Sequence, residues 1–382
     1  MDTFSLAPEQ RSLYESATAF AQRHVAPVAA ATDASDSFPA AVFEQLAAGG
    51  WLGLTAPADV GGQEAHPLSV ALVLEAVSAA SGAIGSSLNA HVSLTCALLA
   101  EHASAEQRAE FLPELVAGAS LGAFCLTEPS GGSDTAGMRT SARRDGSDYL
   151  ITGEKAFITN APVAGVFVVA ARTSAGEGAD GISGFVVRRD APGLTVGRAD
   201  HKHGMNGSPT AAVHFDEVRV PRAHLLGEEG SGLQQFRHTL ELGRVNVAAL
   251  CIGLGRAALE LATAYPRERR QFGKAIGTYQ GVQWPLADSA TELEGSWLLT
   301  EHAARRAQAG LPLRKHASMA KLAASNAAVR TARRAVEIFG GNGYMKDYAV
   351  ERILRDAQMY TIGEGTSEIQ RMVIARELTG RL

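Results

Sequence analysis

The sequence predicts a mainly α-helical protein with a β domain in its middle. Residues 1–120 and 231–382 carry apolar side chains at helical spacing, whereas residues 121–230 break into short apolar runs. Gly, Pro, Asp and Ser clusters separate these runs, which is typical of a small barrel or sandwich. We therefore expect three domains: an N-terminal helical domain (1–120), a middle β domain (121–230) and a C-terminal four-helix bundle (231–382).

Length and composition are those of an ordinary globular enzyme. The 382 residues are 46% hydrophobic and 20% charged, with a net charge of −5 and no basic block, so nothing favours nucleic acid. Cys96, Cys125 and Cys251 lie far apart, which favours buried thiols in a reducing compartment. The first eight residues have neither a basic nor an apolar leader region, so we expect a cytoplasmic protein.

Helices are predicted over 8–30, 39–49, 67–80 and 105–117. Between Ala76 and Ala100 there is no Asp, Glu, Lys or Arg, a length that could suit a membrane span. This stretch also holds Ser, Asn, His and Thr residues. We therefore expect a buried or pocket-lining helix here and no contact with a membrane.

The middle domain is predicted from its short apolar or alternating runs. These lie at 123–127, 149–152, 166–171, 184–187, 194–196 and 211–215.

Three long amphipathic segments follow, with apolar stripes along 240–261, 282–297 and 322–336. The cluster Gly340–Gly343 ends the third of them. A shorter segment over 366–378 supplies the fourth helix of the predicted bundle.

The stretch 355–376 is the most informative for function. Glycines on both sides of Glu364 free the backbone, and Thr366 or Ser367 can cap the next helix, with Glu368 in its first turn. A carboxylate beside a helix N-terminus, where an anion is favoured, suggests a base that acts on a cofactor-bound substrate. The plain alternative is an exposed helix–turn–helix.

Three other motifs suit a ligand. The loop 126–134 offers glycine N–H groups and the hydroxyls of Thr127 and Ser133, although it could be an ordinary β-turn. Phe157 and Thr159 could cover a flat ring and bond its edge, although a core phenylalanine is the commoner case. The basic cluster 267–273 either ends a helix or clamps a diphosphate through Arg269.

A metal site is not expected. His201, His203 and His214 are close in sequence, but no suitably spaced carboxylate or cysteine completes a ligand set.

The order of these motifs strongly resembles that of the acyl-CoA dehydrogenase family. The resemblance is carried by Leu-Thr-Glu-Pro-x-x-Gly-Ser-Asp, Phe-Ile-Thr-Asn, Arg-x-Gln-Phe-Gly, Ile-Phe-Gly-Gly-Asn-Gly-Tyr and Glu-Gly-Thr-Ser-Glu-Ile-Gln-Arg, at 126–134, 157–160, 269–273, 338–344 and 364–371. It covers essentially the whole chain and implies the family's α–β–α fold. It also implies noncovalent FAD between the β domain and the bundle.

The resemblance also implies the site residues. Within one subunit, the residues implied to bind FAD are Phe124, Leu126, Thr127, Gly132, Ser133, Phe157, Ile158, Thr159, Thr366 and Glu368. A second set is implied to reach the FAD of a neighbouring subunit: Arg269, Gln271, Phe272, Gln280, Glu337, Ile338, Gly340 and Gly341. Ser133, Glu241, Arg244 and Gly365 are implied to contact the thioester substrate.

Glu364 matches the catalytic base of the family. A subset of members carries the base on the long helix instead, in a slot that Gly243 occupies here, so Glu241 is the nearby alternative. Many members have tyrosine before the base, where this chain has Gly363, which implies a roomier pocket.

The implied reaction is α,β-desaturation of an acyl-CoA, with α-proton abstraction and β-hydride transfer to flavin N5. The implied partners are an electron-transfer flavoprotein as acceptor and further copies of the chain, in a homodimer or homotetramer. Two alternatives stay open within the fold: acyl groups on a carrier protein, or an oxidase or hydroxylase that uses O₂. A remote alternative is a non-catalytic helical binding protein.

Overall fold

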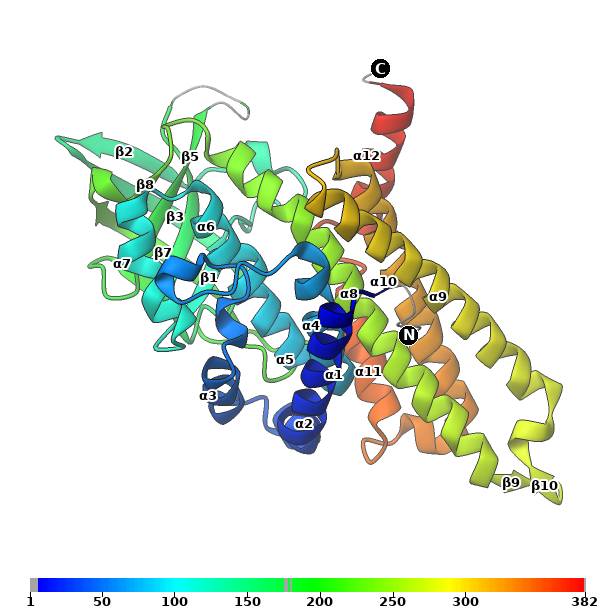
Figure 1. The fold of residues 1–382 in the computed structure, drawn as a ribbon. Coiled ribbons are helices and arrows are strands. Elements are labelled where there is room, and N and C mark those ends of the chain that lie inside the picture. The colour runs from blue at the N-terminus through cyan, green and yellow to red at the C-terminus, as the bar shows by residue number, and fades with distance from the viewer. Residues whose placement is uncertain (1–5, 175–177, 179–180, 381–382) are drawn as a thin grey trace.

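The structure is a computed structural model that describes residues 6–174, 178 and 181–380. Residues 1–5, on which the expectation of a chain without a leader depends in part, lie outside this description. Helices come first along the chain, then a sheet, then helices again (Figure 1). The predicted fold class is therefore confirmed.

The N-terminal helices begin where prolines allow them to. Pro8 and Pro67 occupy the first turns of α1 (Pro8–Phe20) and α4 (Pro67–Ala80), where a missing N–H costs nothing. The predicted helix over 8–30 forms as α1, a π-helical turn, a 3₁₀ turn and α2. Apart from the long helix described next, the other elements of this part are η1 (Ala21–Val25), η2 (Ala26–Val28), α2 (Ala29–Ser35), α3 (Ala40–Ala48), η3 (Trp51–Gly53), η4 (Ala58–Val60) and α7 (Ala105–Val116).

The uncharged stretch 76–100 begins in the C-terminal end of α4 and, after a break at Ser81, forms most of one long, buried helix. This helix runs over Gly82–His102 through α5 (Gly82–Asn89), a π-helical segment η5 (Ala90–Cys96) and α6 (Ala97–His102). Gly82–His102 and Gly232–Glu268 are long and apolar enough to span a membrane, but 83% and 61% of their apolar windows are buried inside the protein. Burial of this kind is what a core helix shows.

An eight-stranded sheet forms the middle of the molecule. Its strand order is β6-β7-β3-β2-β4-β5-β8, with β1 parallel to β4. The sequence predicted neither β2, whose residues are mostly polar and partly exposed, nor β8, which has two residues. The strands are β1 (Leu121–Cys125), β2 (Ser141–Asp145), β3 (Asp148–Thr159), β4 (Ala164–Arg172), β5 (Ile182–Arg188), β6 (Leu194–Val196), β7 (Thr210–Val220) and β8 (Leu225–Leu226), with short 3₁₀ turns at Thr135–Gly137 and Arg222–His224.

Long helices build the C-terminal part. α8 (Gly232–Glu268), α9 (Gln280–Gln308) and α10 (Arg314–Phe339) pack along one another, and α11 (Ala349–Met359) joins α8 and α10. α12 (Ser367–Thr379) contacts α10 and extends beyond the bundle (Figure 1). The fourth helix within the bundle is thus α11, while the predicted one, over 366–378, forms as α12.

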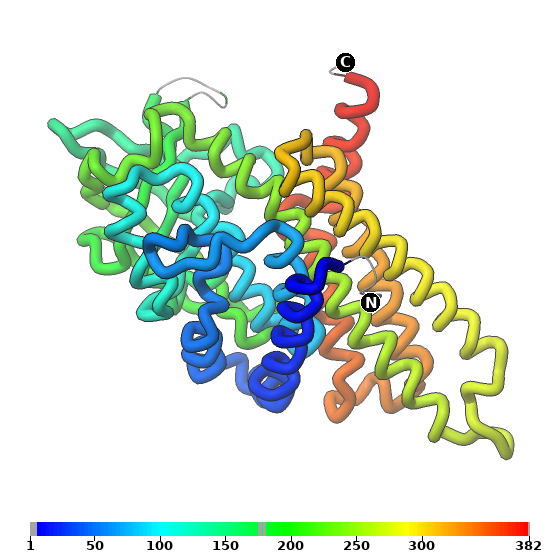
Figure 2. Tube along the Cα trace, viewed as in Figure 1, coloured from blue at the N-terminus to red at the C-terminus, as the bar shows by residue number. Residues whose placement is uncertain are grey.

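A small hairpin marks the far end of the bundle. β9 (Arg270–Gln271) and β10 (Lys274–Ala275) pair between α8 and α9, followed by a 3₁₀ turn (Ile276–Thr278), and Figure 2 shows this hairpin at the opposite end from α12. A second 3₁₀ turn, Gly340–Tyr344, follows α10 at the predicted glycine cluster. The element types change between Val116 and Leu121 and again between Leu226 and Gly232; the domain boundaries themselves stay a prediction.

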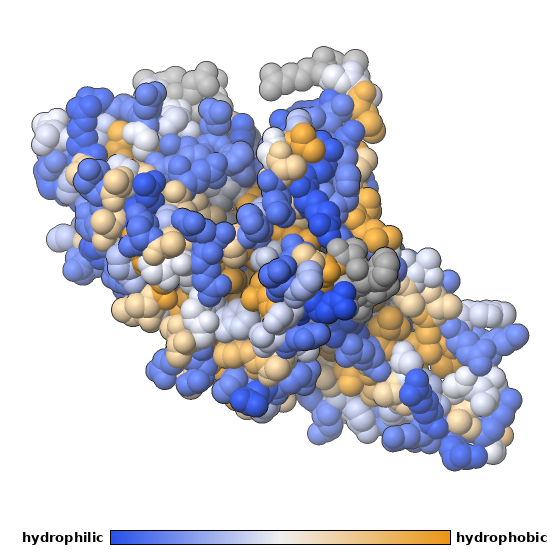
Figure 3. Space-filling model, in the orientation of Figure 1, coloured by the Kyte–Doolittle hydropathy of each residue, from blue (hydrophilic) through white to orange (hydrophobic). Residues whose placement is uncertain are grey.

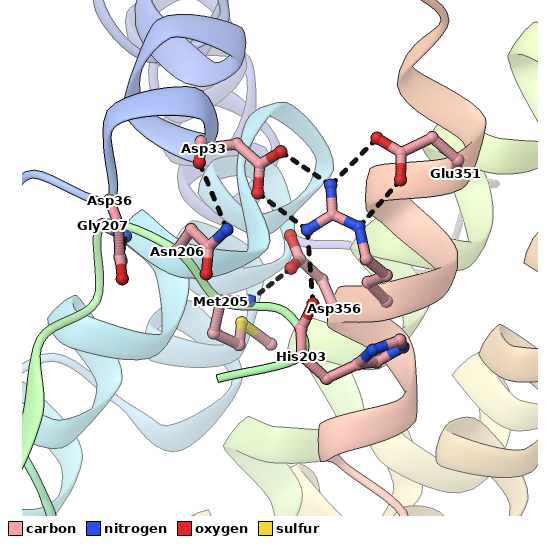
Figure 4. A network of polar contacts seen from close by, with 9 residues as sticks. Asp33, Asp36, His203, Met205, Asn206, Gly207, Glu351 and Asp356 are labelled. Carbon is pink, nitrogen blue, oxygen red and sulfur yellow. Dashed lines mark hydrogen bonds and ion pairs between the residues drawn. The ribbon is translucent and has the colours of Figure 1, made fainter. Parts of the chain in front are cut away.

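Polar contacts along α11 fasten all three parts together (Figure 4). Arg355 of α11 binds Asp33 of α2 at 2.6 Å. Its neighbour Asp356 accepts a 2.6 Å hydrogen bond from the N–H of Met205, in the segment before β7. On the other side of this segment, the Gly207 N–H donates to Asp36. α11, which leads directly to Glu364, is therefore held from two sides.

The three cysteines are buried and free. Over the described ranges, no group of three or more His, Cys, Asp or Glu side chains could hold a metal ion.

Candidate active site

Glu364 lies in the turn between α11 and α12. α12 begins at Ser367, and the Thr366 hydroxyl accepts a hydrogen bond from the Ile369 N–H, so the predicted cap is confirmed. Glu364 and Gly365 have φ values of 52° and 91°, in the left-handed region that is uncommon for a residue other than glycine. The turn thus carries backbone strain at the residue whose side chain faces the cavity.

One of the two oxygens of the Glu364 carboxylate, Oε2, has no access to solvent. Oε1 accepts a 2.9 Å hydrogen bond from Asn89 Nδ2, whereas Oε2 is buried and has no partner in the part of the chain that the structure describes. Burial raises the pKa of Glu364 to about 7, against the opposing charges of Lys321 and Arg244 and the Asn89 hydrogen bond. A carboxylate with such a pKa is a stronger base than an exposed one.

Gly243 faces this carboxylate from α8. A Cβ built on Gly243 would lie 3.0 Å from Glu364 Oε2 and 3.2 Å from Leu94. The slot considered as an alternative place for the base is therefore filled by the Glu364 side chain itself. Glu241, the other alternative, lines the same cavity but lies 3.9 Å from Arg314 in an ion pair.

Two cations lie near Glu364. The Arg244 guanidinium is largely buried, and its Nε and Nη1 have no hydrogen-bond acceptor among the described residues. Burial lowers the pKa of Arg244. The second cation, Lys321 on α10, donates to the carbonyl oxygens of Gly363 at 3.0 Å and Gly365 at 2.6 Å.

Gly363 leaves less room than the sequence suggested. A Cβ there would lie 2.7 Å from Met359 Sδ, so Met359 takes part of the space that a larger residue would use. Met359 itself lines the cavity, and its flexible thioether can adapt to different neighbours.

The loop 126–134 forms the opposite wall and is held by a buried ion pair. Lys155 Nζ lies 2.9 Å from Glu128 and donates to the Leu126 carbonyl oxygen at 3.2 Å. Glu128 also accepts from the backbone N–H groups of Arg139 and Thr140. These bonds fix the loop that presents Thr127 and Ser133 to the cavity.

Phe157 projects from this wall because β3 is irregular there. The pairing of β3 with β7 shifts register between Lys155 and Ile158. Phe157, inside the shift, has a φ of 57° and is 72% exposed, so it is not the core phenylalanine of the plain alternative. An exposed aromatic face on a cavity wall suits a planar ring.

The wall, the Glu364 turn and α5–α6 enclose one cavity of about 1720 Å³. That is more than a single drug-sized ligand needs, so it can hold a cofactor and a substrate together. The sequence-predicted residues that line it are Phe124, Leu126, Thr127, Gly132, Ser133, Phe157, Ile158, Thr159, Glu241, Arg244, Glu364, Gly365 and Thr366.

The other predicted residues lie elsewhere. Glu368 is exposed on the first turn of α12. The set implied to reach a neighbouring subunit lies at the far end of the bundle, where the Tyr265 and Phe339 rings stack at 4.0 Å and join its two halves. Phe272 is 94% exposed there. Their contact with FAD stays a prediction that needs a second copy of the chain.

Sequence reasoning missed Asn89, Lys321 and Met205, of which Met205 lines the cavity. Asn89 had a weak signal as an amide in an uncharged helix. Lys321 had none, because nothing in its local sequence distinguishes it from the other lysines.

The fold and the cavity together define a class of protein. A buried carboxylate of raised pKa faces a wall with an exposed aromatic ring and hydroxyl donors, between a β domain and a helical bundle. This arrangement fits a flavin-dependent oxidoreductase that removes a proton from its substrate.

The sequence matches the three models of one family in order. Residues 7–119 match the N-terminal domain of acyl-CoA dehydrogenase, 123–218 the middle domain and 230–379 the C-terminal domain. A probable acyl-CoA dehydrogenase of Bacillus subtilis is 43% identical over 98% of this chain and 99% of its own. The chain therefore belongs to the acyl-CoA dehydrogenase family, and it is a flavoprotein oxidoreductase whose cofactor is FAD.

Solved structures agree across the whole length. Butyryl-CoA dehydrogenase from Megasphaera elsdenii has a TM-score of 0.95 at 35% identity, covering 99% of this chain and all of the other. A chain from the electron transferring flavoprotein structure of Acidaminococcus fermentans has a TM-score of 0.97 at 36% identity, with both chains fully covered.

Two further structures concern carrier-bound or proline chemistry. PigA with FAD and proline has a TM-score of 0.95 at 32% identity, and the prolyl acyl carrier protein oxidase AnaB one of 0.95 at 31%. PigA covers 99% of each chain, and AnaB covers 98% of this chain and all of its own.

Proposed function

We propose that this protein desaturates an acyl-CoA between its α and β carbons, with Glu364 as the base. The observation that supports this most is the environment of Glu364, which combines a buried Oε2, a pKa raised to about 7 and a place in the cavity wall. A base with a pKa near the working pH removes a weakly acidic proton efficiently without being protonated most of the time.

A residue of the chain, Glu364, accepts the proton that leaves the substrate. The Glu364 carboxylate takes the α-proton of the thioester, and the electron pair of the broken C–H bond forms the new C=C bond. FAD, when bound, supplies the two-electron acceptor for the hydride that leaves the β carbon. Phe157, Thr127 and Ser133 would hold the isoalloxazine ring, since they present an aromatic face and two hydroxyls to the cavity.

Cations in the cavity suit a phosphorylated substrate. Arg237, Arg314 and Arg376 all line it. Guanidinium groups bind phosphate well, and coenzyme A and the phosphopantetheine of a carrier protein both carry phosphate. The likeness to AnaB therefore keeps carrier-bound acyl groups as the second candidate, whereas the Bacillus subtilis relative at 43% identity is a probable acyl-CoA dehydrogenase.

We also infer that the protein works as an oligomer and passes electrons to an electron-transfer flavoprotein. Apolar side chains lie exposed along the C-terminal part, as Figure 3 shows for the face drawn there. Those with the largest exposed fractions are Phe272, Tyr344, Leu378, Trp284 and Ile362. Exposed apolar residues of this number suit contact with further copies of the chain.

Anaerobic bleaching of the flavin tests the proposal. The wild-type protein is mixed with straight, branched and aromatic acyl-CoAs and with matched acyl-carrier proteins, and the loss of flavin absorbance is followed. The Glu364→Gln variant should keep its yellow colour and lose most of this bleaching, by about 10³-fold or more. Full activity of Glu364→Gln would refute the role of Glu364, and bleaching by carrier-bound substrates alone would favour the second candidate.

A further inference from the structure

Lys321 is buried deep in the bundle without an acidic partner. Its side chain is fully buried, and it takes part in no ion pair within the described part of the chain. Lys155, the other fully buried lysine, is paired with Glu128 at 2.9 Å. A charged group is costly to bury unless specific bonds compensate it. For Lys321 these bonds go to backbone carbonyls alone.

Those carbonyls flank the catalytic turn. Lys321 Nζ lies 3.0 Å from the Gly363 oxygen and 2.6 Å from the Gly365 oxygen, one on each side of Glu364. Gln370 Nε2 adds a 2.8 Å bond to the Gly365 oxygen. The peptide groups before and after Glu364 are thus both tied to the bundle, which helps to offset the strain of its left-handed backbone.

Tying the Gly363 oxygen also orients the Glu364 N–H. In a trans peptide the C=O and the N–H point in opposite directions, and the Gly363 carbonyl and the Glu364 N–H belong to one peptide group. With the oxygen turned into the bundle toward Lys321, the N–H is turned the other way. It has no acceptor among the residues that the structure describes, so it is free to serve a ligand.

The charge of Lys321 acts on the carboxylate as well. Lys321 and Arg244 oppose the burial that raises the pKa of Glu364. Burial in turn lowers the pKa of Lys321 to about 8. The other titratable groups that influence one or both of these residues are Cys251 on α8, Tyr360 after α11 and Glu368 on α12.

We propose that Lys321 is a positioning residue for proton abstraction. By fixing the carbonyls of Gly363 and Gly365, it directs the Glu364 N–H to the substrate carbonyl oxygen and holds the carboxylate in place, and its charge favours the ionised form of that carboxylate. This rests on the proposed role of Glu364 as the base. Donors aimed at a developing oxyanion are worth a large part of the rate in such reactions.

The test separates proton abstraction from electron transfer. A thioester whose β carbon carries no hydrogen cannot be desaturated, so exchange of its α-hydrogen with D₂O, followed by NMR, reports Glu364 and its turn alone. The variants are Lys321→Met, which removes charge and donors, and Lys321→Gln, which removes the charge but keeps an N–H donor. Ser325→Ala, one turn along the same helix and also buried, is the matched control.

Lys321→Met should bind FAD and lose about 100-fold in exchange rate. Its pH profile should move upward by about one unit, because the cation no longer favours the carboxylate. Lys321→Gln should show the same pH shift with a smaller loss at high pH, and Ser325→Ala should behave as wild type. A lysine that only stabilised the fold would lower the melting temperature without moving the pH profile.

The outcomes distinguish this inference from the proposed function. If wild type and Glu364→Gln exchange equally, the role of Glu364 fails first. If Glu364→Gln is inactive and FAD-loaded Lys321→Met matches wild type in rate and pH profile, only the role of Lys321 is refuted. Loss of FAD or of cooperative unfolding in both Lys321 variants would make it a folding determinant and also overturn the inference.

Discussion

Asn89 offers the sharpest prediction, because it is the only neutral side chain that binds the Glu364 carboxylate in the described structure. Its amide donates to Oε1 at 2.9 Å and so favours the ionised form. Asn89→Leu keeps the shape of the side chain and removes that donor. The pKa of Glu364, about 7 in the wild type, should then rise.

The size of the rise follows from the strength of the bond. A hydrogen bond to a charged group is worth about 1.5–3 kcal/mol, and one pKa unit corresponds to about 1.4 kcal/mol. The pKa should therefore increase by about one to two units. At pH 7 the ionised fraction would fall from about one half to about 1–10%, a loss of roughly 5- to 50-fold in rate.

The pH dependence of flavin reduction, followed by anaerobic stopped-flow between about pH 5.5 and pH 9.5, measures this change in the pKa of Glu364 directly. The rate of the variant should approach the wild-type rate at high pH, where Glu364 is ionised in both proteins. Ser93→Ala, four residues further along the same buried helix, is the control and should leave the profile in place. A pH profile of Asn89→Leu that coincides with that of wild type would refute the reasoning.

Two further predictions concern stability. The folded pKa of Glu364, about 7, is above its ordinary value of 4.5, so the folded state binds the proton more tightly than the unfolded state and wild type loses stability as the pH rises from about 4.5 to 7. The free energy of unfolding of Glu364→Gln, measured with urea, should therefore exceed that of wild type by up to about 3 kcal/mol at pH 8 and by almost nothing at pH 4.5. A difference that does not depend on pH would contradict this prediction. Lys155→Met leaves Glu128 buried without its cation and should cost about 3–5 kcal/mol and weaken FAD binding, seen as a lower melting temperature and release of free flavin. Lys202→Met, at a partly exposed lysine 4.0 Å from Asp36, is its control and should change stability by less than about 1 kcal/mol.

The sequence was sufficient for the features that depend on local chemistry. Apolar spacing predicted the long helices, and the residues around Glu364 predicted a turn capped by Thr366 or Ser367, of which Thr366 is the cap, because these signals lie within a few neighbouring residues. Asn89 and Lys321 could not be found in this way. They lie 275 and 42–44 residues from their partners in the turn, and only the packing of α5 and α10 brings them there.

The position of the proposed base follows from the limited space between α8 and the turn that carries Glu364. Oε2 of Glu364 lies 3.0 Å from the point where any side chain at 243 would begin, and Leu94 closes the same space from the other side at 3.2 Å. A carboxylate at 243 and one at 364 would therefore compete for one volume, and two like charges at that distance could not both ionise. This competition does not arise because residue 243 is glycine, which leaves room for the Glu364 carboxylate. At this point α8 contributes the cation Arg244 and no second carboxylate. Glu241, two residues earlier, lines the same cavity and is paired with Arg314. The turn after α11 is then the only part of the described cavity wall that brings a carboxylate against both Asn89 and Gly243.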